Sequence, residues 1–400
     1  MRALIVGAGP TGTALSFLLA RRGIEVVLLE REDGLDRVFR GEALMPSGVD
    51  AITQMGLSEA FDRLPQRRVE CMEFFVEGAR IIRADWPEVT GRNAACLVSQ
   101  PALLEMLVES ARQHHTFELR LGTTVRDRRV TVDGIELDLQ SRSGSETVTG
   151  DVVVGADGRG SLIRARANLP VERLPFPFDV AWFSVPIPPS QRDDPRFQAF
   201  SRGDRGVALY PSWDDRLRVG LTVPHHDVSL LSGASKQRLL VEFTRVVGEP
   251  YASFFWDHAD EITDPVLLKI LFGRCRQWSA PRTLLLGDAA HPMSPVRAQG
   301  INLALRDAIV AANHLVPALH SDAPDAFDRA ARQIQQAREP EIIASQRYQV
   351  LAAQPPPPAR WAVFRTTVLP ILHRLGMVKR VFLKAEVPMR HGTVPMRLSV

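Results

Sequence analysis

Cysteines and long apolar runs are both scarce in this sequence. The chain of 400 residues holds three cysteines, Cys71, Cys96 and Cys275, which form no CxxC pair and no metal-like cluster. This usage predicts reduced thiols in a cytoplasmic protein and no metal site. No uninterrupted apolar run approaches about 18 residues, and the first residues resemble a strand rather than a signal peptide. We therefore expect neither a transmembrane segment nor a secretory leader.

Aromatic residues are also few, and the net charge is small. Aromatics make up 7% of the chain and the formal net charge is +3, with no recognised nucleic-acid-binding motif, so nucleic acid is not an expected partner. The charge is uneven, because residues 359–400 carry eight Lys and Arg against one acid, Glu386. We expect this basic tail to pack against its own domain. An anionic substrate or a membrane surface is the alternative partner.

The start of the chain does contain a nucleotide-binding pattern. The residues MRALIVGAGPTGTALSFLLARRGIEVVLLERE indicate a strand, then Gly7, Gly9 and Gly12 at GxGxxG spacing, a helix, and a second strand ending at Glu30. The glycines permit a tight turn and let a pyrophosphate approach the helix N-terminus. The Glu30 carboxylate is expected on an adenosine ribose, which favours NAD or FAD over NADP.

Two further segments combine a strand with a polar turn. VVVGADGRGSLIR places Asp157 at the end of a strand, and LLLGDAAHPMSPVRAQGINLALRDA places Asp288 after a strand and begins a helix near Gly300. With GAGPTG, these segments resemble the three fingerprints of the FAD-dependent aromatic hydroxylases typified by p-hydroxybenzoate hydroxylase. Geranylgeranyl reductases and flavin halogenases share them. The resemblance implies bound FAD, with NADH or NADPH as a transient co-substrate.

The resemblance and the element pattern together predict an α/β fold. We expect an FAD-binding three-layer Rossmann-type domain, an inserted β-sheet substrate domain and a C-terminal helical segment. We assign residues 1–70, 95–175 and 274–354 to the FAD-binding domain, 71–94 and 176–273 to the substrate domain, and 355–400 to the helical tail.

The resemblance also implies which residues contact the cofactor. Asp157 would serve both FAD and the reduced nicotinamide, and Asp288 would bind the ribityl chain. The helix that begins at Gly300 would direct its N–H groups at the pyrimidine part of the flavin. The residues implied in FAD binding are Gly7, Gly9, Pro10, Thr11, Gly12, Glu30, Arg31, Arg40, Gln100, Asp157, Asp288, Gln299, Gly300, Ile301 and Asn302.

Three residues are candidates for the reacting side of the site. Pro295 would lie beside the reacting edge of the flavin, and Arg218 matches a family arginine near the flavin. Tyr210 is on the neighbouring predicted strand. Because successive side chains of a strand point to opposite faces, either Arg218 or Tyr210 could face away from the site.

The reaction implied by the resemblance is a hydroxylation. Reduced nicotinamide and O2 would be used to hydroxylate an aromatic or similarly activated small molecule through a flavin C4a-hydroperoxide. The alternative is an FAD-dependent reduction of an unsaturated carbon, as in geranylgeranyl reductases; oxygen uptake distinguishes the two. No WxWxIP motif is present, which disfavours a halogenase. We expect a monomer or a homodimer.

One position departs from the family pattern. Arg297 stands where the hydroxylases commonly have a glycine in the loop before the flavin-facing helix. Its side chain either points to solvent or brings a permanent positive charge near the flavin or the substrate. In the same region we expect His291 to be a structural residue and Asp307 to be a surface or capping group.

Overall fold

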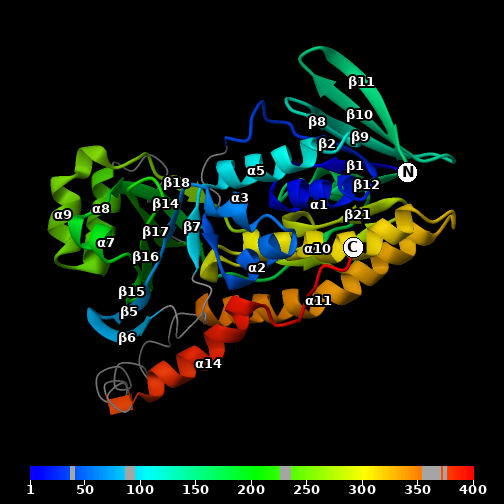
Figure 1. Cartoon of the computed structure of the whole chain (residues 1–400). Helices are drawn as coiled ribbons and strands as arrows, with labels where there is room; N and C mark the ends of the chain where they lie inside the picture. Colours follow the sequence, from blue (N-terminus) through cyan, green and yellow to red (C-terminus); the bar gives the residue numbers. More distant parts are fainter. Residues whose placement is uncertain (37–40, 86–94, 226–235, 354–370, 373–375) are drawn as a thin grey trace.

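The computed structural model describes residues 1–36, 41–85, 95–225, 236–353, 371–372 and 376–400, and the structural statements below refer to these ranges. Two large sheets dominate the molecule, one at each side of the view in Figure 1. Within the described ranges, no helix is both long enough and apolar enough to span a membrane.

The first large sheet has six strands and carries the N-terminal pattern. Five of its strands are parallel, and β20 pairs antiparallel at one edge. Strand β12 and residues 3–6 of β1 are buried apolar runs, as expected for parallel strands covered on both faces. In spatial order the strands are β20 (Ser279–Ala280), β21 (Thr283–Leu285), β12 (Val152–Gly155), β1 (Arg2–Val6), β2 (Glu25–Leu29) and β8 (Phe117–Arg120).

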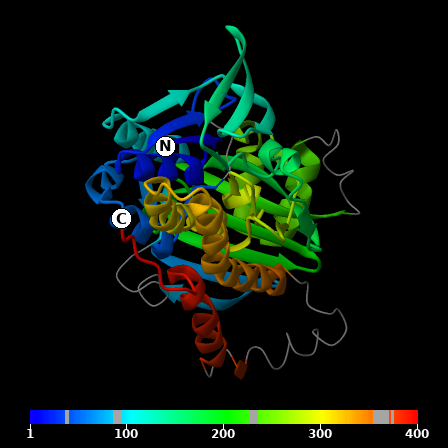
Figure 2. The same cartoon turned by 90° about the vertical axis from the view of Figure 1, so that its right-hand side faces the viewer.

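Helices and a small sheet cover this six-stranded sheet. Helix α1 packs against α5 and α10, and α10 packs in turn against α11 and α2. An antiparallel sheet of β9, β10 and β11 contacts β1 and projects from the top of the molecule in Figures 1 and 2. The elements are α1 (Pro10–Ala20), α2 (Pro46–Gln54), α3 (Ser58–Asp62), α5 (Gln100–Arg112), α6 (Leu162–Arg166), α10 (Gly300–Leu319), α11 (Ala326–Ala353), β9 (Thr124–Val130), β10 (Ile135–Ser141) and β11 (Gly144–Gly150).

The second large sheet has seven strands. Its only parallel pair joins β15 to β5, so two segments far apart in sequence form one surface. Helices α8 and α9 cover it, with Phe243 and Phe255 in the core between them and the sheet. In spatial order the strands are β18 (Val266–Leu268), β14 (Phe178–Pro186), β17 (Arg216–Pro224), β16 (Arg205–Pro211), β15 (Arg196–Arg202), β5 (Cys71–Val76) and β6 (Ala79–Asp85).

Short elements connect the two large sheets. A three-stranded sheet orders β3, β7 and β4, and β13 pairs with β19. The α/β fold with a C-terminal helix is as predicted; the residue boundaries assigned to the two domains stay a prediction. The connecting elements are β3 (Ala43–Leu44), β4 (Gln66–Arg68), β7 (Cys96–Val98), β13 (Val171–Arg173) and β19 (Gly273–Cys275). The helices beside the seven-stranded sheet (Figure 1) are α7 (Pro189–Asp193), α8 (Lys236–Val247) and α9 (Tyr251–Asp257).

The described part of the tail packs on the chain itself, as expected. Helix α14 (Met377–His391) lies at the bottom of Figures 1 and 2 and contacts β6 and α2. Beyond it, Leu398 N–H donates to the Gln54 side chain at 2.7 Å, and Asn313 Nδ2 donates to the Arg397 carbonyl at 2.8 Å. The tail therefore touches both the seven-stranded sheet and the helices of the six-stranded sheet.

Candidate active site

The three sequence motifs meet at the carboxyl edge of the six-stranded sheet. Strands β21, β12 and β1 are adjacent and parallel, so the turns that follow them lie side by side. A Cβ at Gly7 would come 2.5 Å from the Ala156 carbonyl oxygen, and a Cβ at Gly287 would come 2.5 Å from Thr11 Oγ1. The first motif thus contacts both of the others, and glycine is needed at each contact.

The first turn has the geometry expected for a pyrophosphate site. Gly7 has φ +101°, and a Cβ at Gly12 would lie 1.9 Å from the Gly7 carbonyl oxygen, so only glycine lets α1 begin this close to β1. Helix α1 begins at Pro10, and its N-cap residue Gly9 makes no side-chain cap hydrogen bond. The N–H groups and dipole of this helix end are therefore available to an anion, which fits the dinucleotide predicted here.

The acid that follows β2 is buried at the same edge. Glu30 is 4% exposed; its Oε2 accepts from Ala8 N–H at 2.8 Å and its Oε1 from Glu32 N–H at 3.1 Å. Arg31 is exposed and pairs with Glu32 at 3.0 Å. Gln100 is buried at the start of α5. Arg40 lies outside the described residues. Contacts of these four residues with a cofactor stay predictions.

Asp157 of the second motif caps a helix. Its carboxylate accepts hydrogen bonds from the Ser161 hydroxyl at 2.5 Å and from the N–H groups of Leu162 and Ile163, the first two residues of α6. Burial raises the pKa of Asp157, although these hydrogen bonds oppose the shift. Arg164 of α6 then donates to the Ala289 carbonyl at 2.9 Å. Asp157 thus fixes the turn that joins the second motif to the third, and its predicted cofactor role stays a prediction.

Asp307 is not the surface or capping group that the sequence predicted. It is fully buried on α10, where it accepts from His291 Nε2 at 2.7 Å, from Arg338 Nε at 2.7 Å and from the N–H of Gly287 at 3.0 Å. Burial would raise the pKa of Asp307, but His291 and Arg338 outweigh it and hold that pKa at about 2. The prediction failed because helical spacing did not reveal that α11 covers this face of α10.

Helix α10 begins at Gly300 as predicted, and its first turn meets β3. Asn302 Oδ1 accepts from Met45 N–H at 2.8 Å, and its Nδ2 donates to the Ala43 carbonyl at 3.1 Å. A Cβ at Gly48 would lie 2.2 Å from Asn302 Oδ1, so glycine makes this contact possible. A Cβ at Gly300 would meet no atom within 4 Å. The helix end therefore faces open space, and contact of this end with the flavin stays a prediction.

A large cavity extends from this helix end to the seven-stranded sheet. Its volume is about 970 Å³, and it is lined by Asp288, Pro295, Gly300 and Ile301 on one side. Arg218 and Tyr210 line the other side, so both predicted side chains face inward. The aromatic side chains on the cavity side of the sheet and tail are Phe74, Phe178, Trp182, Phe197, Tyr210 and Phe382, whereas Phe183 and Phe200 pack under α8 and α9.

Arg218 is held by a buried acid that sequence analysis did not single out. Its Nε and Nη2 donate to Glu42 Oε1 at 3.0 and 2.8 Å, and Nη2 also donates to Asp214 at 2.9 Å. The Ser212 hydroxyl donates to Glu42 as well. Burial raises the pKa of Glu42 even though Arg218 lowers it. Burial and the nearby Glu42 raise the pKa of Tyr210 well above its ordinary value, so its phenol stays protonated.

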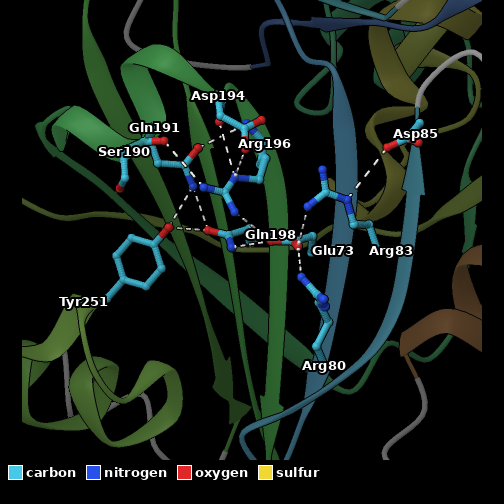
Figure 3. Close-up of polar contacts among 10 residues, drawn as sticks. All are labelled: Glu73, Arg80, Arg83, Asp85, Ser190, Gln191, Asp194, Arg196, Gln198 and Tyr251. Carbon is cyan, nitrogen blue, oxygen red and sulfur yellow. Dashed lines mark hydrogen bonds and ion pairs between the residues drawn. The ribbon is translucent and has the colours of Figure 1, made fainter.

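The opposite face of the seven-stranded sheet carries a separate polar cluster. Met72 and Phe74 line the cavity, whereas Glu73 between them points the other way. Glu73 is 1% exposed and accepts from Gln198 Nε2 at 2.8 Å and from Arg80 at 2.8 Å, as Figure 3 shows. These contacts fasten β5 and β6 to β15 and so keep the cavity wall in place.

The Arg297 side chain points into the cavity and not to solvent. Its side chain is 19% exposed and lines the cavity, and Nη1 lies 3.0 Å from Glu386 of α14. Its backbone has φ +65°, the left-handed conformation that glycine adopts most readily. The family glycine position thus keeps a glycine-like backbone here, with an arginine side chain added. Gln299 is buried and donates to the Arg297 carbonyl at 3.0 Å.

Comparison with known proteins identifies the family to which these motifs belong. Residues 1–339 match the family model described as FAD binding domain. A 6-methylpretetramide 4-monooxygenase from Streptomyces rimosus is 32% identical over 355 residues, which cover 88% of this chain and 83% of that protein. A 3-hydroxybenzoate 6-hydroxylase from Klebsiella oxytoca is 26% identical, covering 77% of this chain and 78% of that one.

A solved structure has a similar fold over most of the chain. Pseudomonas aeruginosa PqsL in complex with 2-aminobenzoylacetate has a TM-score of 0.76 at 25% identity, and the match covers 87% of this chain and 94% of that one. The curated relatives above are named as a monooxygenase and a hydroxylase, which favours the monooxygenase prediction over the reductase alternative.

Proposed function

Since this chain belongs to the FAD-dependent monooxygenases of the p-hydroxybenzoate hydroxylase type, we propose that it hydroxylates a polycyclic hydroxyaromatic molecule. The observation that carries this proposal is the aromatic-walled cavity of about 970 Å³ between α10 and the seven-stranded sheet. That volume is at the upper end of the range for small-molecule sites, about 300–1,000 Å³. The flavin ring would occupy the part of this cavity beside α10, so the size of the substrate is inferred from the row of aromatic rings in the wall and from the similarity to the 6-methylpretetramide 4-monooxygenase.

The wall of the cavity supports a flat, extended substrate. Phe74, Phe197, Tyr210 and Trp182 follow one another across the sheet with ring centroids 6.3, 6.1 and 6.1 Å apart. A Cβ at Gly220 would lie 2.9 Å from the Trp182 ring, so this glycine makes room for the indole. Such a row of rings favours stacking and edge contacts with a fused aromatic system.

The polar groups of the cavity support a hydroxylated substrate. The Tyr210 hydroxyl remains protonated and would donate a hydrogen bond to a substrate oxygen. Glu42 would accept the proton of a substrate hydroxyl at its carboxylate, and Arg218 would hold that carboxylate in position. Removing this proton makes the ring more electron-rich, which favours attack by an electrophilic oxygen. These roles extend the predicted catalytic set of Pro295, Arg218 and Tyr210.

FAD, when bound, would supply the electrons taken from NADH or NADPH and the activation of O2. The chain would hold its pyrophosphate at the N-terminus of α1 and its ring system at the N-terminus of α10. Asp288 would bind the ribityl chain, and Pro295 would close one side of the ring pocket. A cytoplasmic location remains an expectation, in keeping with the three buried, unpaired cysteines. A monomeric or homodimeric state also remains an expectation.

Oxygen uptake with a panel of phenols tests this function. The FAD-loaded protein would be mixed with NADH or NADPH and either hydroxyanthraquinones or monocyclic hydroxybenzoates. We expect the polycyclic compounds to stimulate oxygen uptake most and to yield products heavier by one oxygen atom. Stronger stimulation by the monocyclic compounds would contradict the proposed substrate class. Oxidation of the nicotinamide without any oxygenated product would contradict the proposal that the protein hydroxylates these phenols.

A further inference from the structure

A second buried charge cluster lies where α14 meets the flavin-facing loop. The Glu386 side chain is fully buried and accepts from two guanidinium groups, with Arg297 Nη1 at 3.0 Å and Arg390 Nη2 at 2.8 Å. The Tyr348 hydroxyl donates to the same carboxylate. One carboxylate therefore serves two arginines and one neutral phenol.

Both arginines of this cluster line the cavity, among apolar neighbours. Arg297 lies over the Phe74 ring at 5.0 Å and over the Phe382 ring at 5.8 Å. Arg390 is 3% exposed and lies against the thioethers of Met45 and Met72. Because these neighbours carry no charge and exclude water, the field of the cluster is weakly screened inside the cavity.

The charges of this cluster do not cancel. Among the residues that the structure describes, Arg297 and Arg390 contribute two positive charges to it, and Glu386 contributes one negative charge. Burial would raise the pKa of Glu386, but Arg390 and Arg297 outweigh it, so this carboxyl group is ionised at neutral pH. The ion pairs around Arg218 have the opposite net charge, because two carboxylates, Glu42 and Asp214, pair with one arginine. The cavity thus has a positive cluster beside α14 and a negative cluster at the seven-stranded sheet.

The backbone at Arg297 indicates that the side chain has a specific use. Arg297 and Ala298 have φ +65° and +52°, a conformation in which a side chain is disfavoured relative to glycine. Glycine would fit this turn with less strain, and the side chain that is present reaches the cavity and the Glu386 carboxylate.

We propose that Arg297 and Arg390 together bind an ionised acidic group of the substrate, either a carboxylate or the enolate of a β-dicarbonyl unit. Guanidinium groups recognise both anions through charge-assisted hydrogen bonds. The proposal rests on the proposed function, because it assumes that the cavity holds the substrate. The acidic end of that molecule would then lie beside α14, and its phenolic end would lie beside Glu42 and Tyr210.

The test compares an anionic ligand with a neutral one of the same shape. The probes are rhein, a dihydroxyanthraquinone carboxylate, and rhein carboxamide, which lacks the charge. Their dissociation constants would be measured by fluorescence titration of the FAD-loaded protein without nicotinamide, so that no turnover is needed. We expect the wild type to bind the carboxylate more tightly. Arg297→Gln should weaken that binding by about tenfold, and Arg297→Lys should weaken it less, while carboxamide binding barely changes.

Glu386→Gln gives a result of opposite sign. It removes the negative charge and leaves both guanidinium groups, so carboxylate binding should tighten. A purely structural cluster would instead lose affinity in both variants. Arg129→Gln, which changes a surface arginine of strand β9 in the small antiparallel sheet, is the matched control and should alter neither affinity. FAD content and melting temperature verify folding, and if Glu386→Gln does not fold, the Arg297→Gln and Arg297→Lys pair decides alone.

Three results would overturn the inference. They are failure of the wild type to prefer rhein over its carboxamide, equal weakening of both ligands by Arg297→Gln, and weakening of rhein binding by Glu386→Gln. The proposed function fails separately, in the oxygen-uptake assay. A charge-selective site in a protein that oxygenates no phenol would leave this inference standing, whereas an active hydroxylase without charge selectivity would remove it.

Discussion

Glu42 and Arg218 form a buried ion pair of 2.8 Å that links the segment before β3 to strand β17 of the seven-stranded sheet. Three residues further on, Met45 N–H donates a hydrogen bond to Asn302 Oδ1 of α10, and the Met45 thioether lies against Arg390 of α14. The short segment 42–45 therefore joins the seven-stranded sheet, helix α10 and the tail. Changes here are expected to alter the shape of the cavity as well as local stability.

The first prediction concerns Glu42. Glu42→Gln should retain FAD but lower the hydroxylation rate, because the amide cannot accept the substrate proton. The pKa of Glu42 is raised, so in the wild type the rate should fall as the pH falls through this raised value and the carboxylate becomes protonated. The variant should lack this acidic limb. A pH–rate profile of oxygen uptake measures both, and an identical acidic limb in the two proteins would contradict the assignment.

The second prediction concerns Asn302. Asn302→Ala removes hydrogen bonds to Met45 N–H and to the carbonyls of Ala43 and Ala298. The buried backbone groups lose their partners, so the free energy of unfolding should fall by about 1–3 kcal/mol. Urea unfolding of the FAD-free protein measures this loss. Asn302→Asp keeps the Oδ1 acceptor and loses the Nδ2 donors, and it should show whether the Met45 bond alone holds β3 in place.

The third prediction concerns Asp307. Asp307→Asn removes one of the two buried carboxylates that pair with Arg338, the other being Glu341, and it should cost about 3–5 kcal/mol of stability. Because the pKa of Asp307 is depressed to about 2, its ionised form stabilises the fold at pH values above the unfolded value of about 3.9. This stabilisation is lost as the pH falls towards about 2.

Chemical denaturation at several pH values tests that dependence. The stability difference between wild type and Asp307→Asn should be constant near neutral pH and should shrink between about pH 4 and pH 2. Asp138→Asn is the control, because Asp138 forms a surface pair with Arg129 on the small antiparallel sheet. It should give a far smaller change. A difference between wild type and Asp307→Asn that does not depend on pH would show that ionisation of Asp307 is not the cause.

The fourth prediction separates two glycines of the cofactor site. At Gly12 a Cβ would lie 1.9 Å from a backbone oxygen, so Gly12→Ala should destabilise the FAD-free protein and abolish FAD binding. At Gly300 a Cβ would meet nothing, so Gly300→Ala should leave the FAD-free protein intact and weaken FAD binding only. Thermal unfolding of FAD-free protein and titration with FAD measure the two effects. Full FAD affinity in Gly300→Ala would place the flavin elsewhere.

The backbone of the three motifs could be predicted from the sequence. Gly7 and Gly12, the turn with Asp157 and the helix start at Gly300 were all predictable, because each depends on a short segment and its backbone conformation. The order of these motifs also predicted a parallel sheet with the three turns at one edge, since parallel strands align their carboxyl ends.

The side chains that face the cavity and the charges that lie together could not be predicted from the sequence. The partners Glu42 and Arg218 are 176 residues apart, and Met45 and Asn302 are 257 apart. Strand alternation left Arg218 and Tyr210 with two possible orientations. Arg297 had no local partner, and the Glu386 carboxylate that binds it belongs to a different helix. The physical reason is that burial and ion pairing depend on which elements pack together, and a local pattern of residues does not contain that information.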